Sequence, residues 1–322
     1  MRSSSTCNLT TFPTSSGVSA LEYRDVLRYA LWDGQIGEYP ISSADSPSIS
    51  APALSICTIS TDEVYIGTVA GEVWRVTGSE KKIVVQNQEV RTYGGCKVSS
   101  VVSMHRFKDQ LVIVFLVGKV CLYHLERHQV TSEYWVDGTI TLSAIKGDLV
   151  AYVVNNTNLE TYNLQTGQIE KRVCLAAMIT RICFLHGEAN VVVCGTADGK
   201  VTLCYLDTVE ADFTFKAHRK TKANEEIFFP VVMLASLTVN ELITGGADGK
   251  VYLWDIKRRH KISTLYSAKR TILAGEISVA REKKPSMCLV LGSGIESLYA
   301  PEPQAGINIC IVPLAGQIYL NL

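Results

Sequence analysis

Short apolar, β-branched runs alternate with polar turns along most of the chain. Runs of this kind, bounded by glycine, aspartate and asparagine, predict β-strands joined as hairpins. Apolar residues almost never recur at helical spacing, so we expect an all-β protein. Six hairpins are predicted from paired runs: residues 27–32 with 35–39, 63–68 with 72–77, 111–116 with 119–124, 149–154 with 158–162, 191–195 with 200–206, and 241–244 with 250–255.

The hairpin turns recur at a nearly constant spacing. Successive turn positions lie 37 to 50 residues apart, and WD repeats have a period of about 40 to 45 residues. Asp-Gly pairs in three of these turns supply the positive φ that two-residue hairpins require. The repeat predicts a seven-bladed WD-repeat β-propeller. The predicted turn residues are Gly34, Gly71, Gly118, Asn158, Gly199 and Gly249.

A seventh unit is predicted over residues 278–312, with strands at 287–291 and 307–312. Either the segment 8–12 or the segment 317–321 would close the ring, because closure hides sheet edges. We therefore expect an N-terminal segment of residues 1–14, which is one candidate for the closing strand, and one propeller over residues 15–322. Two stacked β-sandwiches are the alternative, since regular strand spacing fits both architectures.

Composition narrows the classes of function. Lys plus Arg equal Asp plus Glu, 31 each, so no net charge favours nucleic acid or an anionic membrane. No apolar run approaches the length of a membrane span, and the amino terminus lacks the pattern of a secretory signal. The ten cysteines form no C-x-x-C pair and are predicted to be reduced and buried. We expect a soluble intracellular protein without metal or cofactor.

Enzyme signatures are absent from the sequence. There is no nucleophile elbow, phosphate-binding glycine loop or H-E-x-x-H motif. A non-enzymatic binding protein is therefore the first hypothesis. An enzyme whose acidic or histidine residues gather in the central channel is the alternative from another class, because catalytic groups can be dispersed in sequence.

Blade geometry selects the candidate binding face. In a WD-type blade, the turn between the second and third strands and the crossover to the next blade share one face. This places Trp32, Lys119, Lys200, Lys250 and the loop 216–226 on one rim around the channel. Exposed tryptophans often anchor partners, although Trp32 could instead pack between blades.

Two basic runs have competing interpretations. In the first, Phe213 and Phe215 pack against a sheet face while Lys216, Arg219 and Lys220 extend a basic loop. Those charges are either merely solvated or form a clamp for a carboxylate or phosphate. The second run, residues 257–261, falls on the opposite face; a solvated loop is favoured over a nuclear-targeting signal because the net charge is zero.

Several stretches carry a family resemblance. They are A-D-G-K-V-T-L-C-Y-L-D, F-T-F-K-A-H-R, I-F-F-P-V and T-G-G-A-D-G-K-V-Y-L-W-D within residues 197–255, L-W-D-G at 31–34 and Y-I-G-T-V-A-G-E-V at 65–73. This text resembles the mitotic checkpoint Bub-three family of WD-repeat proteins and its relative, the messenger-RNA export factor Rae-one. The resemblance is weak over residues 94–181 and after 277.

The resemblance implies a hub that binds the GLEBS motif of checkpoint kinases or their relatives and reads phosphorylated M-E-L-T motifs of a kinetochore scaffold. Trp32 and Lys200 match family positions of the GLEBS surface, with lysine in place of the usual arginine, and we add Lys250 to this surface. Arg219 matches the arginine associated with phosphothreonine. The second family cation falls near Asn240, which is uncharged. Three lysines are candidates to replace it: Lys216, Lys220 and Lys250.

The sequence therefore predicts a spindle-checkpoint adaptor with no direct nucleic-acid or membrane partner, monomeric within its complex. It is expected in the nucleus, on kinetochores in mitosis and in the cytoplasm. The alternative is an export factor of the Rae-one type that binds the GLEBS motif of a nucleoporin.

Overall fold

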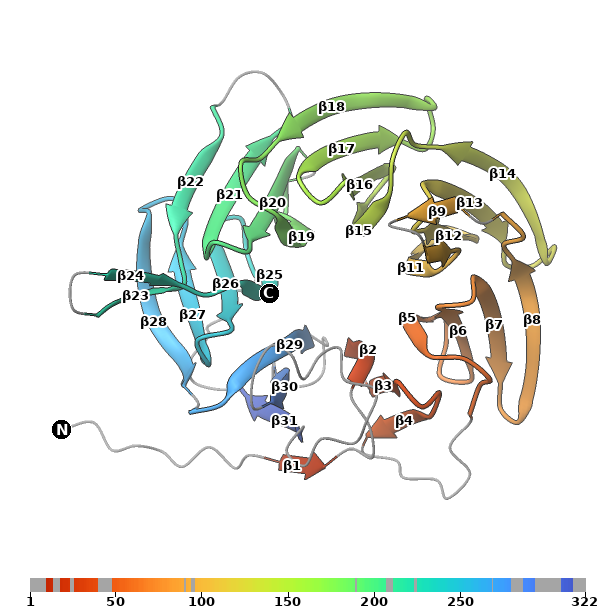
Figure 1. Ribbon diagram of the computed structural model, residues 1–322, viewed down its shortest axis with the longest axis horizontal. Coiled ribbons are helices and arrows are strands. Elements are labelled where there is room, and N and C mark those ends of the chain that lie inside the picture. Colours follow the sequence, from red (N-terminus) through yellow and green to blue (C-terminus); the bar gives the residue numbers. More distant parts are fainter. Residues whose placement is uncertain are drawn as a thin grey trace.

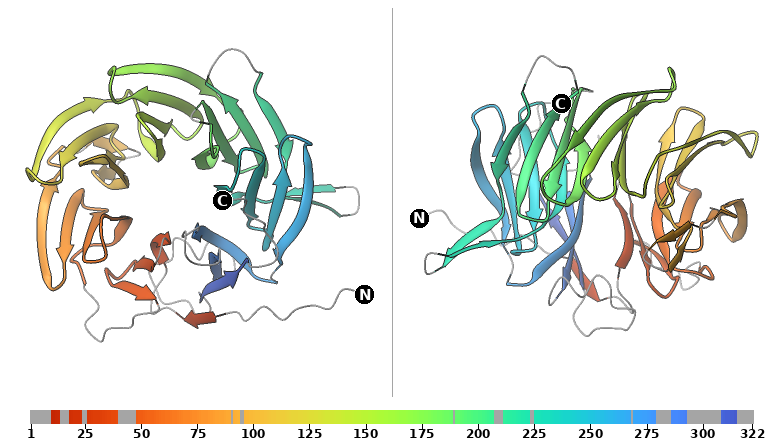
Figure 2. Two further views of the ribbon diagram at one scale, coloured as in Figure 1. Left: turned by 180° about the vertical axis from the view of Figure 1, so that it is seen from behind. Right: turned by 45° about the horizontal axis from the view of Figure 1, so that its top comes forward.

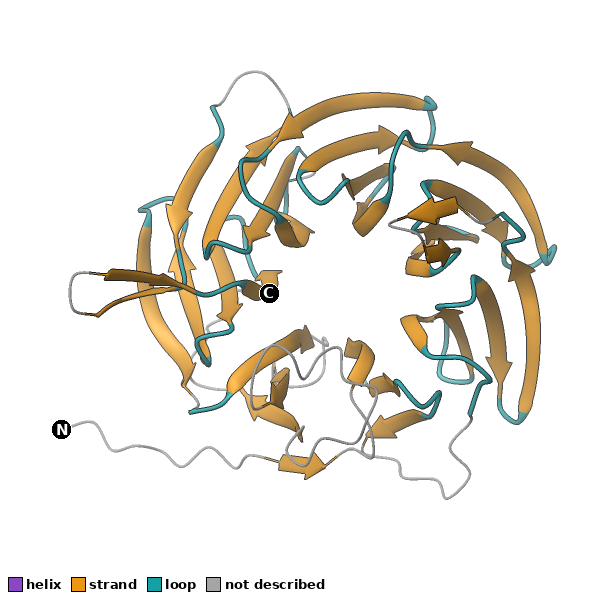
Figure 3. Ribbon diagram, viewed as in Figure 1, coloured by secondary structure: helices purple, strands orange, loops and turns teal. Residues whose placement is uncertain are grey.

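Antiparallel strand pairing organises the whole of the described chain. The computed structural model describes residues 10–13, 18–23, 26–39, 48–89, 91–93, 96–188, 190–206, 211–222, 225–267, 269–278, 286–292 and 308–314. These residues form strands, turns and connections without a helix (Figure 3). Seven sheets stand radially around a central axis, so the fold is a seven-bladed β-propeller (Figure 1). The predicted all-β, seven-bladed WD-repeat architecture is confirmed.

The first three blades follow chain order, with the first strand of each next to the axis. Blade one contains β2 (Val18–Tyr23), β3 (Leu27–Leu31) and β4 (Ile36–Tyr39). Blade two contains β5 (Ala53–Thr58), β6 (Glu63–Thr68), β7 (Glu72–Thr77) and β8 (Glu80–Gln86). Blade three contains β11 (Val101–Phe107), β12 (Gln110–Phe115), β13 (Lys119–His124) and β14 (Gln129–Trp135).

The next three blades repeat this order. Blade four contains β15 (Ile140–Lys146), β16 (Leu149–Val154), β17 (Asn158–Asn163) and β18 (Gln168–Cys174). Blade five contains β19 (Ile179–Phe184), β20 (Val191–Thr196), β21 (Lys200–Tyr205) and β22 (Phe213–Lys216). Blade six contains β25 (Val231–Ser236), β26 (Glu241–Gly246), β27 (Lys250–Asp255) and β28 (His260–Ser267).

Blade seven is built from both ends of the sequence. It contains β29 (Thr271–Ser278), β30 (Ser286–Gly292), β31 (Asn308–Pro313) and, as its outer strand, β1 (Thr10–Pro13). β1 runs antiparallel to β31, with Thr10 opposite Ile311. Of the two candidate closing segments, the amino-terminal one thus supplies a strand of this blade, and residues 317–321 lie outside the described residues. The domain boundary at residues 14 and 15 stays a prediction.

Two crossovers between blades carry small hairpins of their own. β9 (Arg91–Tyr93) and β10 (Cys96–Val98) pair between blades two and three. β23 (Arg219–Lys222) and β24 (Glu225–Phe228) pair between blades five and six. The second hairpin extends outward beyond the ring of blades (Figures 1 and 2).

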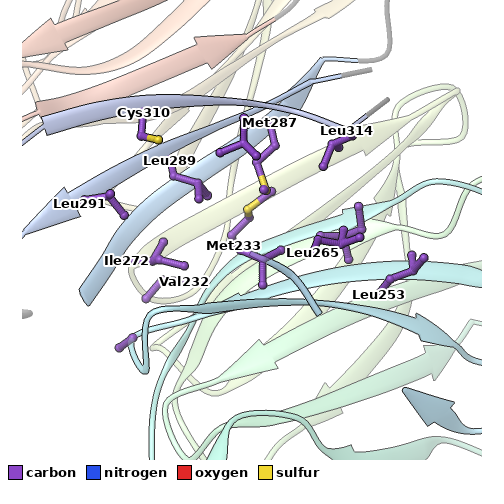
Figure 4. Close-up of a cluster of buried hydrophobic side chains, with 14 of the residues drawn as sticks. Val232, Met233, Leu253, Leu265, Ile272, Met287, Leu289, Leu291, Cys310 and Leu314 are labelled. Atoms are coloured by element: carbon purple, nitrogen blue, oxygen red, sulfur yellow. The ribbon is translucent and has the colours of Figure 1, made fainter. Parts of the chain in front are cut away.

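The hydrophobic core is divided among the seams between neighbouring blades. Between blades six and seven, Met233 and Leu265 meet Ile272, Met287 and Leu289 (Figure 4). Each inner or middle strand is covered on both faces, which favours continuous apolar runs. All six residues of β16 are buried, whereas β18 at the outer edge of the same sheet is mostly exposed. This burial explains why the second strands gave the strongest signals in the sequence.

The turns between second and third strands are of a different type from the two-residue turn that the Asp-Gly pairs suggested. Gly34, Gly71, Gly118, Gly199 and Gly249 all have positive φ, as expected, and each donates its N–H to the carbonyl three residues before it. This is the three-residue hairpin loop, a type I turn followed by a left-handed residue, and not the predicted two-residue turn.

The turn of blade four also differs from its prediction. Asn155 and Asn156 have φ of 51° and 68°, and asparagine tolerates this left-handed region. Asn158, the predicted turn residue, is instead the first residue of β17. The turn of this blade therefore lies two to three residues earlier than expected.

A repeated hydrogen bond fixes these turns to the crossovers. The carbonyl of Gly71 accepts from Asn87 N–H at 2.9 Å, that of Gly118 from Val136 at 2.8 Å, and that of Gly199 from Ala217 at 2.8 Å. Asn87, Val136 and Ala217 all follow the outer strand of their own blade. Turns and crossovers therefore share one face of the propeller, which we name the crossover face.

A candidate peptide-binding face

A buried polar network holds blades five and six together beneath the crossover face. The side chains of His218 and Asp248 are fully buried, with Nδ1 of His218 2.9 Å from Oδ1 of Asp248. Nε2 of His218 lies 2.9 Å from Oγ1 of Thr244, and Thr244 in turn accepts a hydrogen bond from Nε1 of Trp254 at 2.9 Å. His218 also stacks on Tyr252, at 5.0 Å between ring centroids. Hydrogen bonds thus connect Trp254 to Thr244, Thr244 to His218 and His218 to Asp248, so both ring nitrogens of His218 have a partner.

This network is also the base of the β23–β24 hairpin. The carbonyl of Gly199 accepts from the N–H groups of Ala217 and His218, at 2.8 and 2.9 Å, and Phe229 N–H donates to the carbonyl of His218 at 3.1 Å. Both ends of the hairpin are therefore tied to one buried residue. A Cβ on Gly199 would lie 2.2 Å from the carbonyl oxygen of His218, so only glycine permits this approach.

The basic residues of the crossover are paired with an acid of the same hairpin. Nη1 of Arg219 lies 2.6 Å from Glu226, and Nζ of Lys216 lies 3.6 Å from the same carboxylate. Nζ of Lys220 lies 5.0 Å from the ring centroid of Phe229. Residues 216–226 were predicted as a loop beside the channel, but residues 219–228 form a hairpin that points away from it (Figure 1). The pairing of Arg219 with Phe228 and of Lys222 with Glu225 accounts for this difference.

Phe213 and Phe215 pack against their neighbours, as the sequence analysis predicted. Their rings stack at 5.8 Å, and Phe215 lies 4.9 Å from Trp254 of blade six. Arg259, from the predicted basic run 257–261, places its guanidinium 4.2 Å from the Phe213 ring centroid. The aromatic pair thus belongs to the seam between blades five and six.

Lys200 is held at the edge of this seam by its own turn. Its ammonium lies 2.5 Å from Asp198, and Thr196 also donates to this carboxylate. Burial opposes ionisation of Asp198, but the hydrogen bonds from Lys200 and Thr196 outweigh it, and the pKa of Asp198 is lowered. Lys200 is directly opposite Lys216 in the sheet. The pair keeps two cations side by side, and each has a carboxylate partner.

The remaining predicted residues lie on the same face but not in one cluster. Lys250 begins β27, and its N–H donates to Asp248 at 3.3 Å, so it borders the His218 network. Trp32 is half-buried in the turn between β3 and β4 of blade one. Blade seven separates it from blade six. The structure therefore brings Lys200, Lys216 and Lys250 to the five–six side and leaves Trp32 on another blade.

Lys119 does not lie on an accessible rim as predicted. It is buried, and its ammonium lies 3.0 Å from Glu133 and 3.9 Å from Glu89. Burial alone would lower the pKa of Lys119, but the hydrogen bond to Glu133 and the charges around it raise the pKa. The sequence could not reveal this, because a lysine at the start of a strand is exposed or covered according to its neighbour across the sheet, here Trp135.

The described side chains do not assemble a candidate metal site. No cluster of three or more His, Cys, Asp or Glu residues among them could hold a metal ion. Burial raises the pKa of the Cys183 thiol to about 12, and Cys194 and Cys288 are shifted in the same direction, so these thiols are poor nucleophiles. In the described part of the chain, no helix is long and apolar enough to cross a bilayer.

Sequence reasoning missed two features of the crossover face. It did not connect His218 with Asp248, Thr244 and Trp254, although a histidine before a blade and a Trp-Asp pair at its third strand form the known signature of a WD repeat. It also missed Trp135, which is 41% exposed at the end of β14. An aromatic residue shortly before an Asp-Gly pair was the available signal.

The comparisons with known proteins agree with this geometry. No family model matches the chain. In structure it is similar to "Structure of U3-55K" (TM-score 0.73, 14% identity, 95% of this chain and 98% of that one) and to "Crystal structure of RRP9 WD40 repeats" (TM-score 0.71, 13% identity, 95% and 97%). The fold and the His218 network define a seven-bladed WD-repeat propeller.

Similarity in sequence indicates which WD-repeat proteins this chain is related to. The chain is 21% identical over 271 residues to "Spindle assembly checkpoint protein bub3" of Schizosaccharomyces pombe, covering 80% of this chain and 82% of that protein. It is 22% identical over 269 residues to "Mitotic checkpoint protein bub3" of Dictyostelium discoideum, covering 79% and 80%. A match to "Mitotic checkpoint protein BUB3.1" of Arabidopsis thaliana is 29% identical over 85 residues, a quarter of either chain. The chain is thus a WD-repeat propeller whose sequence is similar to Bub3 proteins over about four fifths of its length.

Proposed function

We propose that this protein is a non-enzymatic adaptor of the spindle assembly checkpoint. Its crossover face binds the GLEBS motif of a checkpoint kinase or a relative of one, and recruits that partner to phosphorylated M-E-L-T-type motifs of a kinetochore scaffold. The relatives named as checkpoint proteins cover most of this chain and support the checkpoint role. They do not support the export-factor alternative over it.

The observation that carries the proposal is the gathering of part-exposed cations on the crossover face. Lys200 is 39% exposed, with its ammonium beside Asp198 of its own turn, and Lys250 is half-buried at the start of β27. At Lys200, a glutamate of an incoming peptide would meet an ammonium group that is already oriented, which lowers the entropic cost of binding. Trp32 is the proposed aromatic anchor, since tryptophans often dominate binding energies.

The phosphopeptide half of the proposal rests on Arg219, Lys216 and Lys220. Glu226 accepts from Arg219 and lies close to Lys216, so a phosphate would have to displace this carboxylate or share its cations. A phosphate carries more charge and more acceptor oxygens than a carboxylate, which favours the exchange. We place the adaptor in the nucleus and on mitotic kinetochores, with a cytoplasmic pool.

Recovery of partners from mitotic cells tests which branch of the family the chain follows. Affinity capture of the full chain is expected to recover a checkpoint kinase or kinase-like protein that contains a GLEBS motif. A Trp32→Ala variant serves as the matched control and is expected to lose it. Recovery of nucleoporins without a checkpoint protein would overturn the assignment.

Phosphate reading is tested separately with a phosphorylated and an unphosphorylated M-E-L-T peptide. We expect Arg219→Ala to weaken the phosphorylated peptide selectively, by about 1.5 to 3 kcal/mol, because a charge-assisted hydrogen bond is lost. Glu226→Gln is expected to strengthen it, since the competing carboxylate is removed. Equal binding of both peptides to the unmodified chain would contradict this half of the proposal.

A further inference from the structure

The seam between blades two and three exposes an indole on the crossover face. Trp135 is the last residue of β14 and is 41% exposed. It stands directly opposite Lys119 in the sheet, with the Lys119 ammonium 5.8 Å from its ring centroid. Trp135 and Glu133 lie two positions apart on β14 and therefore on the same face of the strand. The exposed ring thus has a fixed acidic neighbour.

Two part-exposed carboxylates flank the ammonium that lies near this ring. Glu133 and Glu89 have side chains that are 42% and 55% exposed, and both flank the ammonium of the buried Lys119. Asp137, two residues after Trp135 in the crossover, is exposed as well. One buried ammonium thus faces two carboxylates, each with oxygen lone pairs left for an incoming donor. Among the side chains described here, the surface around Trp135 is acidic.

We propose that the Trp135 surface, formed by Trp135, Glu133 and Glu89, is a docking site for a peptide segment in which arginine stands next to an apolar side chain. The guanidinium would pair with the exposed carboxylates through directed hydrogen bonds and stack on the indole face. The apolar neighbour would cover the rest of the ring. The exposed carboxylates of the site disfavour phosphopeptides and nucleic acids as its occupants.

This surface is separate from the one that carries the proposed function. It lies on blades two and three, whereas Lys200, Arg219 and Lys250 belong to blades five and six or to the crossover between them. The two surfaces carry opposite charge and share one face. A partner bound at the five–six side could therefore occupy the face together with a second, basic segment of the same or another chain.

Indole signals give a direct test on the full chain. The sequence contains four tryptophans, so a nitrogen-15 spectrum resolves their Nε1–H groups, and the Trp135→Phe variant identifies the signal of Trp135. The probes are three short peptides with the central sequences Arg-Phe-Arg, Gln-Phe-Gln and Glu-Phe-Glu. Trp74, whose indole donates to Glu72 at 2.9 Å, is the internal control for a tryptophan beside a carboxylate.

We expect the Arg-Phe-Arg peptide to shift the Trp135 signal saturably. Its affinity should be about tenfold higher than that of Gln-Phe-Gln, because it gains one cation–π contact and one or two ion pairs. Glu89→Gln is expected to weaken this binding about threefold. Glu126→Gln changes an exposed glutamate in the β13–β14 turn of the same blade and is expected to have no effect. Absence of a saturable shift, or equal binding of Glu-Phe-Glu, would overturn the proposal.

Discussion

The two seams that carry an extra hairpin on the crossover face are stabilised in different ways. Between blades five and six, a histidine with no exposure connects an aspartate, a threonine and a tryptophan. Between blades two and three, a buried lysine reaches out to two carboxylates that remain largely in water. The first seam hides its polar groups, and the second presents them to solvent.

The difference in burial separates polar residues that fix the structure from polar residues that stay accessible. A buried polar group without a partner is costly, so a fully buried network fixes one geometry. Exposed carboxylates can exchange partners at little cost, because surface ion pairs contribute little. The five–six network therefore fixes the base of the β23–β24 hairpin, whereas at the two–three seam the polar groups themselves stay accessible to solvent.

The largest expected effect separates the two polar centres. His218→Ala is expected to lower the free energy of unfolding by about 3 kcal/mol, because Asp248 and Thr244 would be left buried without their partner. Lys119→Met is expected to cost about 1 kcal/mol or less, since Glu133 and Glu89 remain hydrated and the aliphatic stem is kept. Urea unfolding of both variants measures the contrast.

His260→Ala is the control for histidine removal, because His260 is exposed in blade six; it is expected to change stability by less than about 0.5 kcal/mol. Equal losses for His218→Ala and Lys119→Met would show that the two seams are not stabilised differently.

A smaller pair of effects isolates the contact between turn and crossover. Gly199 and Gly78 both have positive φ, but a Cβ meets the His218 carbonyl at the first and nothing within 4 Å at the second. Gly78→Ala is expected to cost about 1 kcal/mol from the left-handed backbone alone. Gly199→Ala is expected to cost about 3 kcal/mol, because the crossover must also move. Similar melting temperatures for the two variants would refute the close approach.

The smallest effect concerns the acid dependence of the Lys200 turn. The pKa of Asp198 is lowered from 3.8, so its ionised form stabilises the fold above pH 3.8 and this contribution is lost as the pH falls through the folded-state value. The stability difference between the chain and Asp198→Asn should be below about 1 kcal/mol at pH 7 and should shrink at pH 3. A difference that grows in acid would contradict the ion pair.

The repeat pattern was enough to predict most of the fold. Paired apolar runs between glycine turns gave the second and third strands of six blades, with several bounds correct to the residue, such as β6 and β13. The β23–β24 hairpin was not predicted because all residues of its two strands are exposed. Without a buried face it has no alternation of apolar and polar positions, and only its backbone pairing defines it.

The candidate site was less accessible to sequence reasoning. The strand order was enough to derive which residues lie on the same face of the propeller. It could not give the exposure of each side chain, so Lys119 was wrongly placed on the rim. Trp32, Lys200 and Lys250 were located on the correct face, and their role in binding stays a prediction. His218 escaped notice because its hydrogen-bond partners Thr244 and Asp248 come 26 and 30 residues further along the chain, and only the fold brings them close to it.

The central claim is that the crossover face binds a GLEBS motif. Calorimetric titration of the full chain with a GLEBS peptide from a checkpoint kinase-like protein of the same organism tests it most directly. We expect one-to-one binding that weakens by about 2 kcal/mol or more in Trp32→Ala, with the fold of the variant verified by its melting temperature. Absence of binding to the unmodified chain, or undiminished affinity in Trp32→Ala with an intact fold, would contradict it.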